Sequence, residues 1–180
     1  LADGPNTYLF ESVQGGERFG RYSIIGLPAR RVYRFFGHTL EVVDDGVVVE
    51  SRKVADPLAE VEAWRRARSV PRPPEPPGFT GGLGGWFGFG GSGFIEPRLS
   101  GAAGRDELGT PDILLMLSEE LAVFDNLKGR LYLITHADPS QDAAFDAAQR
   151  RLDALTARLR EQATTYPAPI TSAVMDESDF

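Results

Sequence analysis

The chain has 180 residues, a net charge of −7, 42% hydrophobic residues, two histidines and no cysteine. The acidic balance argues against a nucleic-acid partner, because phosphate binding normally needs a basic surface. The lack of cysteine excludes disulfides, thiol catalysis and cysteine-held zinc, and it fits a reducing cytoplasm. No apolar run approaches the roughly 18 residues of a membrane helix, so no membrane partner is expected either.

The first predicted element is a hairpin with polar residues gathered at its open end. Residues 8–10 and 22–25 are strand-like, and a Gly-Gly pair in between favours a turn. If these strands pair, an acid and a hydroxyl at the end of the first strand meet a cation, an aromatic ring and a second hydroxyl at the start of the next. These residues are Glu11, Ser12, Arg21, Tyr22 and Ser23.

This combination of side chains suits the binding of a free amino acid. A cation such as Arg21 can bind the carboxylate, Glu11 and main-chain carbonyls can bind the ammonium group, and apolar strand residues can contact the side chain. The alternative is a surface hairpin with an ordinary ion pair, which contributes little energy. Spacing alone leaves both interpretations open.

An antiparallel meander follows, with strands predicted at residues 31–36, 39–43 and 47–51. The sequence Asp44-Asp45-Gly46 supplies the positive φ that a tight hairpin turn requires. Asp56 followed by proline then indicates the N-cap and first residue of a helix that ends near residue 68. Residues 71–78 are rich in proline and predict an extended connector.

The segment 79–99 is rich in glycine and aromatic residues. Residues 88–93 match the G-x-G-x-x-G pattern of dinucleotide-binding proteins, which requires a helix that begins at the last glycines. Pro97 would interrupt such a helix, so a nucleotide site is not favoured. We expect instead that the glycines allow close strand packing and that the neighbouring aromatic rings fill the remaining space.

The last third of the chain predicts strands at 113–117, 121–124 and 130–135, followed by a helix. Ser140 is a candidate N-cap for that helix. Its apolar stripe is expected to face a sheet and consists of Phe145, Ala148, Leu152, Leu155 and Leu159. The sequence therefore predicts an α+β fold, with an antiparallel β-sheet and packed helices.

The sequence "LFES" followed by "GGERFGRYSIIG" resembles the N-terminal region of anthranilate synthase component I. The resemblance continues through "GGLGGWFGFGG", "FIEPRL" and residues 111–138, in the same order. It implies a chorismate-using lyase of tryptophan biosynthesis, of which residues 1–166 would be the regulatory N-terminal half of a layered fold. Residues 167–180 would link it to a C-terminal catalytic domain that binds chorismate and Mg²⁺ and lies outside this chain.

By resemblance, the polar hairpin end becomes part of the feedback pocket for L-tryptophan. Glu11 and Ser12 match the family's Glu-Ser pair, whereas Arg21, Tyr22 and Ser23 match its Arg-Tyr-Ser members, and Arg21 is favoured as the ligand of the effector carboxylate. No catalytic residue and no metal ligand is expected within the chain.

The resemblance also implies a glutamine amidotransferase subunit, component II, as the source of ammonia, and it allows a homo-oligomer. The run of glycines at 88–93 departs from the family pattern and puts a local helix in doubt. Two alternatives stay open: aminodeoxychorismate synthase component I of the folate pathway, and a free-standing amino-acid-binding sensor.

Overall fold

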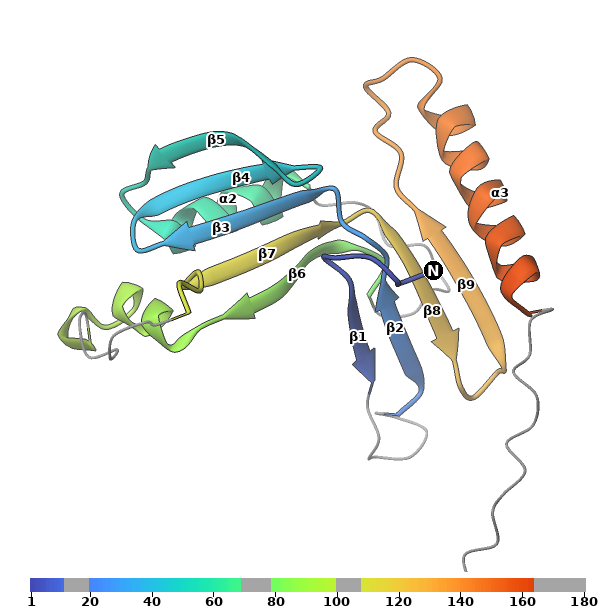
Figure 1. The fold of residues 1–180 in the computed structure, drawn as a ribbon, viewed down its shortest axis with the longest axis horizontal. Helices are drawn as coiled ribbons and strands as arrows, with labels where there is room; N and C mark the ends of the chain where they lie inside the picture. Colours follow the sequence, from blue (N-terminus) through green and yellow to red (C-terminus); the bar gives the residue numbers. More distant parts are fainter. Residues whose placement is uncertain (12–19, 69–78, 100–107, 164–180) are drawn as a thin grey trace, which may run out of the picture.

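The computed structural model describes residues 1–11, 20–68, 79–99 and 108–163 (Figure 1). These residues form two antiparallel sheets set at an angle to each other, with a helix packed beside each sheet. The predicted α+β class is confirmed. None of the helices within these ranges is both long enough and apolar enough to cross a membrane.

The first sheet has five strands in the order β5-β4-β3-β7-β6. Its strands are β3 (Arg31–Phe36), β4 (Thr39–Asp44), β5 (Val47–Lys53), β6 (Gly82–Phe87) and β7 (Ile113–Ser118). The predicted meander β3-β4-β5 is confirmed, and Asp45 and Gly46 at its tight turn have φ angles of 47° and 82°. Both residues therefore adopt the left-handed backbone that this type of hairpin requires.

The main hydrophobic core lies on one face of this sheet. Phe35, Leu40 and Ile113 are fully buried at its centre, because Phe35 pairs with Leu40 on one side and with Ile113 on the other. The ring of Trp64 stacks on Tyr33 with a distance of 4.1 Å between centroids. Burial of these aromatic rings, together with the aliphatic residues around them, stabilises this half of the molecule.

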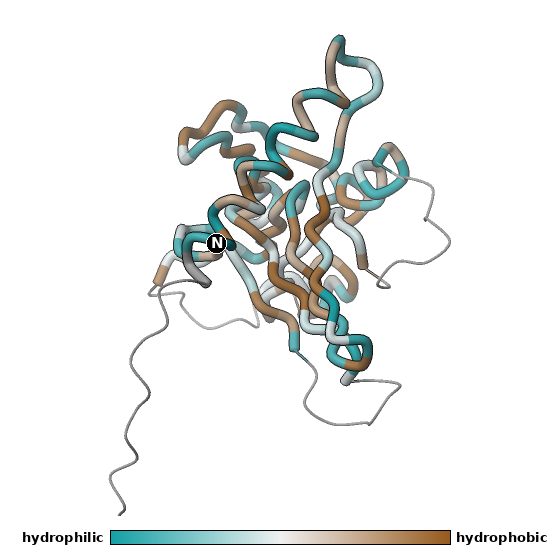
Figure 2. The backbone as a smooth tube through the Cα atoms, turned by 90° about the vertical axis from the view of Figure 1, so that its right-hand side faces the viewer, coloured by the Kyte–Doolittle hydropathy of each residue, from teal (hydrophilic) through white to brown (hydrophobic). Residues whose placement is uncertain are grey.

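The second sheet has four strands in the order β1-β2-β8-β9. These are β1 (Tyr8–Glu11), β2 (Tyr22–Gly26), β8 (Glu120–Asp125) and β9 (Arg130–Thr135). The predicted hairpin of β1 and β2 forms, with Tyr8 opposite Gly26 and Glu11 opposite Ser23. The hydrophobic segments of the chain lie mostly in the strands, and the turns between them are mostly hydrophilic (Figure 2).

The helix α2 (Pro57–Ala67) begins where the sequence predicts it. The carboxylate of Asp56 accepts hydrogen bonds from the amides of Leu58 and Ala59, at 2.9 and 3.1 Å. These bonds satisfy two amides that have no partner within the helix.

The helix α3 (Ala144–Ala163) lies beside β9 and begins later than the predicted cap. The prediction that Ser140 caps α3 is wrong, because the Ser140 hydroxyl donates to Asp138 instead. Ala148 and Leu155 are buried, as the apolar stripe predicts. Phe145 is exposed, because the first turn of α3 extends beyond the end of β9 (Figure 1).

The glycines of β6 permit close contact with β7, as predicted. A Cβ on Gly85 would overlap the carbonyl oxygen of Leu114, which belongs to the rigid backbone of the neighbouring strand. The prediction that the aromatic residues fill this space is wrong for three of them. Trp86 and Phe87, at the end of the edge strand β6, and Phe89, which follows it, all have substantial exposure.

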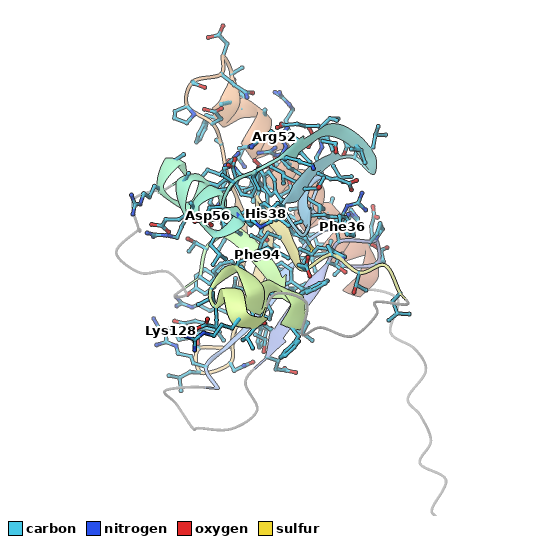
Figure 3. All side chains as sticks on the ribbon, turned by 90° about the vertical axis from the view of Figure 1, so that its left-hand side faces the viewer. Phe36, His38, Arg52, Asp56, Phe94 and Lys128 are labelled. Carbon is cyan, nitrogen blue, oxygen red and sulfur yellow. The ribbon has the colours of Figure 1, made fainter. Side chains whose placement is uncertain are left out.

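The segment after β6 forms the short 3-10 helices η1 (Phe89–Phe94) and η2 (Pro97–Leu99) in place of the long α-helix of a dinucleotide site. Phe94 of η1 contacts the ring of His38 edge-on, with centroids 5.6 Å apart (Figure 3). His38 in turn bonds to the carbonyl oxygen of Val54 through Nδ1, at 3.1 Å. This contact ties η1 to the five-stranded sheet.

We predict that Gly85→Ala lowers the free energy of unfolding by about 1–3 kcal/mol, the usual range for overpacking. The added methyl group can be accommodated only if the backbones of β6 and β7 separate. Gly91→Ala is the matched control, because a Cβ there would make only ordinary contacts. Urea denaturation of both variants measures the difference, and equal stability would contradict the close packing described for β6.

Candidate functional site

A single cross-strand row at one end of the four-stranded sheet combines polar and apolar side chains. Glu11 lies opposite Ser23, Ser23 opposite Phe124, and Phe124 opposite Leu131. Directly paired residues share a face of the sheet, so the four side chains lie side by side. Phe124 and Leu131 are 42% and 44% exposed, which leaves an open apolar floor on the other side of Ser23 from Glu11.

The polar end of this row is joined by hydrogen bonds. The hydroxyl of Ser23 donates to Oε1 of Glu11 at 3.2 Å. The side-chain amide of Asn126, in the turn between β8 and β9, donates to the same hydroxyl at 3.2 Å and to the carbonyl oxygen of Gly20 at 3.2 Å. Segments more than 100 residues apart in the sequence therefore meet around Ser23.

A second group of side chains lies on the opposite face of the same strands. The guanidinium of Arg21 binds Asp125 through Nε and Nη2, with distances of 2.8 to 3.2 Å, and its Cζ lies 4.9 Å from the centroid of Tyr22. Tyr22 pairs with Asp125, whereas Ser23 pairs with Phe124. Since side chains alternate along a strand, Tyr22 and Asp125 lie on the face away from Glu11 and Ser23.

The carboxylate of Asp125 is held in its charged form. Its side chain is 1% exposed, and its Oδ1 also accepts hydrogen bonds from the amides of Leu127 and Lys128, at 3.2 and 3.1 Å. The bond from Arg21, together with these amides, lowers the pKa of Asp125 to about 2. Burial opposes this shift, so the hydrogen bonds dominate.

The structure thus separates the four predicted site residues that lie in its described ranges. Glu11 and Ser23 lie together on one face, and Arg21 and Tyr22 lie together on the other face. Arg21 uses two of its nitrogens to hold Asp125, a partner that the sequence did not suggest. Ser12 lies outside the described residues.

Three residues of the site were missed at the level of sequence: Phe124, Asn126 and Leu131. They come from β8, β9 and the turn between them, and only the pairing of β2 with β8 brings them to Ser23. The single usable signal was the polar pair Asp125-Asn126 directly after an apolar strand, which has the composition of an ordinary turn.

A separate cavity of about 310 Å³ lies between α3 and the junction of the two sheets. Arg151 faces Glu120 there, with 3.4 Å between Nε and Oε1, and also donates to the carbonyl oxygen of His136. The charged groups that line this cavity are thus partly paired with one another. None of the predicted site residues lines the cavity. This cavity is therefore distinct from the cross-strand row.

No protein-family model matches the chain. Among curated proteins it is similar to "Anthranilate synthase component 1" of Pseudomonas aeruginosa, with 50% identity over 91% of this chain. The proteins of the same name from Neisseria meningitidis serogroup C and from Acinetobacter calcoaceticus are 48% and 38% identical, over 89% and 100% of the chain. The resemblance to anthranilate synthase component 1 is confirmed.

The chain spans only about a third of the length of these anthranilate synthase relatives, between 33% and 38%. A crystal structure of anthranilate synthase component I from Streptococcus pneumoniae matches 92% of this chain, and the match covers 33% of that chain, with a TM-score of 0.57 and 21% identity. At this identity the match establishes the fold. The predicted anthranilate-synthase-like architecture is therefore confirmed.

We predict that Asp125→Asn lowers the midpoint of thermal unfolding, because the variant leaves the guanidinium of Arg21 without its charged partner. Asp45→Asn is the control, since the pair between Asp45 and Arg30 is exposed and is expected to contribute little. Differential scanning calorimetry at neutral pH compares the two variants. A larger effect of Asp45→Asn would contradict this assignment.

The same pair predicts a pH dependence. The pKa of Asp125 lies at about 2 in the folded protein, below the ordinary value of 3.8. A carboxylate with a lowered pKa stabilises the folded state at pH values above its ordinary pKa. This contribution is lost as the pH falls toward the pKa in the folded protein. The difference in unfolding midpoint between the wild type and Asp125→Asn should therefore shrink between about pH 4 and pH 2. A difference that stays constant over this range would show that charge is not responsible.

Proposed function

We propose that this chain is the regulatory part of an anthranilate synthase component I. The complete protein would convert chorismate and ammonia into anthranilate and pyruvate, the committed chemistry of tryptophan biosynthesis. The observation that carries this proposal is the similarity to anthranilate synthase component 1, at 50% identity over 91% of the chain. Residues 1–166 would be the N-terminal domain, and residues 167–180 would lead to a catalytic domain.

We further propose that the row from Glu11 to Leu131 forms one wall of a feedback site for L-tryptophan. The carboxylate of Glu11 would bind the ammonium group, and Phe124 and Leu131 would contact the indole ring. This division of roles is supported by the exposure of the two apolar side chains beside a carboxylate. Ser12 would contribute through its place next to Glu11 in the sequence.

The pairing between Arg21 and Asp125 changes the role that we propose for Arg21. Its Nε and Nη2 hold a buried carboxylate, which keeps the start of β2 against the turn after β8. We propose that Arg21, stacked on Tyr22, supports the site in this way and that the effector carboxylate binds elsewhere, on a wall from the rest of the protein.

The chemistry itself would lie outside the described residues. Within them no group of three or more histidine, aspartate or glutamate side chains is arranged to hold a metal ion. We propose that magnesium would be bound by the catalytic domain, together with chorismate. A glutamine amidotransferase, component II, would supply ammonia in the cytoplasm, and a homo-oligomer is compatible with this arrangement.

The printed names of the relatives do not favour the alternative of aminodeoxychorismate synthase, since each relative described above is an anthranilate synthase component 1. The direct test is the product formed by the full-length protein from chorismate and ammonium ions with Mg²⁺. We expect anthranilate, which is identified by its fluorescence and by mass spectrometry. Formation of aminodeoxychorismate, or no turnover of chorismate, would contradict the proposal.

We predict that Glu11→Ala in the full-length protein raises the tryptophan concentration for half inhibition at least tenfold. Loss of a charge-assisted contact to the ammonium group typically costs about 1.5–3 kcal/mol, which corresponds to roughly a tenfold weaker binding or more. Initial rates with and without tryptophan measure the effect as a ratio. Glu50→Ala, which removes an exposed carboxylate from β5 in the other sheet, is the control. Equal inhibition of both variants would argue against a role of Glu11.

A further inference from the structure

We infer that Asn126 is a positioning residue of the tryptophan site: its side-chain amide fixes the direction in which Ser23 donates its proton, and thereby orients the carboxylate of Glu11. This inference rests on the proposed feedback site. It concerns a residue of the β8–β9 turn, 103 positions away from Ser23 in the sequence.

The chemistry of the neighbouring atoms determines the orientation of the Asn126 amide. One atom of that amide lies 3.2 Å from the carbonyl oxygen of Gly20, and a carbonyl oxygen can only accept a hydrogen bond. The atom that faces it must therefore be Nδ2, which is a donor. The same nitrogen lies 3.2 Å from Oγ of Ser23, so the hydroxyl accepts this bond.

This arrangement leaves the proton of Ser23 for Glu11. A serine hydroxyl has one proton to donate, and its oxygen already accepts from Asn126. The proton is directed to Oε1 of Glu11, at 3.2 Å. One carboxylate oxygen of Glu11 is thus held at the end of β1, and we assign Oε2 to the ammonium group of the effector.

Asn126 can act as a fixed reference because its own backbone is held. Its amide donates to the carbonyl oxygen of Arg21 at 2.7 Å. The preceding residue, Asp125, is buried and bound by Arg21 and by two amides of the same turn. The β8–β9 turn therefore holds the start of β2 on both faces of the sheet, through Asp125 on one face and Asn126 on the other.

The side chain of Asn126 contributes little to folding by itself. It is exposed, so water can replace the bonds that a truncated side chain would lose. Its removal should therefore affect the orientation of Glu11 more than the stability of the sheet. This difference separates a positioning role from a structural one.

The test is a double-mutant cycle in the full-length protein, with L-tryptophan as the probe. We expect Asn126→Ala and Ser23→Ala each to raise the concentration for half inhibition about tenfold, as expected for one lost hydrogen bond to a charged group. If Asn126 acts through Ser23, the double variant should be no weaker than Ser23→Ala alone. An additive, roughly hundredfold effect would overturn the inference.

Two further variants sharpen the test. Asn126→Asp keeps the shape of the side chain but replaces the donor by acceptors, so it should weaken inhibition at least as much as Asn126→Ala. Lys128→Ala is the matched control in the same turn, because only the backbone amide of Lys128 takes part in the network. Figure 3 labels this residue. This control variant should leave the inhibition unchanged.

The outcomes separate this inference from the proposed function. If the wild type is inhibited by tryptophan and the Asn126 variants are inhibited equally, this inference fails and the feedback site stands. If Asn126→Ala weakens inhibition but also lowers the unfolding midpoint and the rate without tryptophan, Asn126 has a structural role. In that case the inference also fails. If the wild type is not inhibited at all, the proposed feedback site fails and this inference fails with it.

Discussion

The pairing of β2 with β8 is the contact on which the rest of this structure depends. It joins residues that are 104 positions apart, such as Arg21 and Asp125. All strands of the five-stranded sheet lie between β2 and β8 in the sequence. The pairing extends past the strand ends, since the amide of Leu27 donates to the carbonyl oxygen of Glu120 at 3.1 Å. Bringing such distant segments together has an entropic cost, which the contacts between β2 and β8 must offset.

The ion pair between Arg21 and Asp125 explains how this pairing is held at its open end. The desolvation of Asp125 is offset by five hydrogen bonds, three from the guanidinium of Arg21 and two from backbone amides. A buried carboxylate without such partners would be strongly unfavourable. In the observed register of β2 on β8, Tyr22 lies opposite Asp125 and Ser23 stands between Glu11 and Phe124.

Local patterns in the sequence were sufficient for the elements that local interactions determine. The Asp45-Gly46 turn, the cap of α2 at Asp56 and the β1–β2 hairpin formed as predicted, since each depends on residues within a few positions. The alternation of faces within β2 could also have been read from the sequence. It shows that Tyr22 and Ser23, as adjacent residues of one strand, cannot serve the same face.

The failures came from features that no local pattern contains. The exposure of Trp86 and Phe87 depends on β6 lying at the edge of its sheet, and the exposure of Phe145 depends on where β9 ends beneath α3. Likewise, Asn126 resembles any turn residue until β8 is known to lie beside β2. Tertiary neighbours, not propensity, give these residues their surroundings.

The composition of the site also bears on how regulation would work. Its apolar floor, Phe124 and Leu131, is open, and Leu9 on the same face is 58% exposed, so a ligand bound only there would keep much of its surface in water. Burial of an aromatic ligand on both sides needs a second wall. A site shared between two parts of a protein binds its ligand best in one relative arrangement of those parts, and the ligand then favours that arrangement. The network around Asn126 would keep the wall formed by the four-stranded sheet in one geometry. The ligand would then change the relative arrangement of the two parts and leave this sheet unchanged.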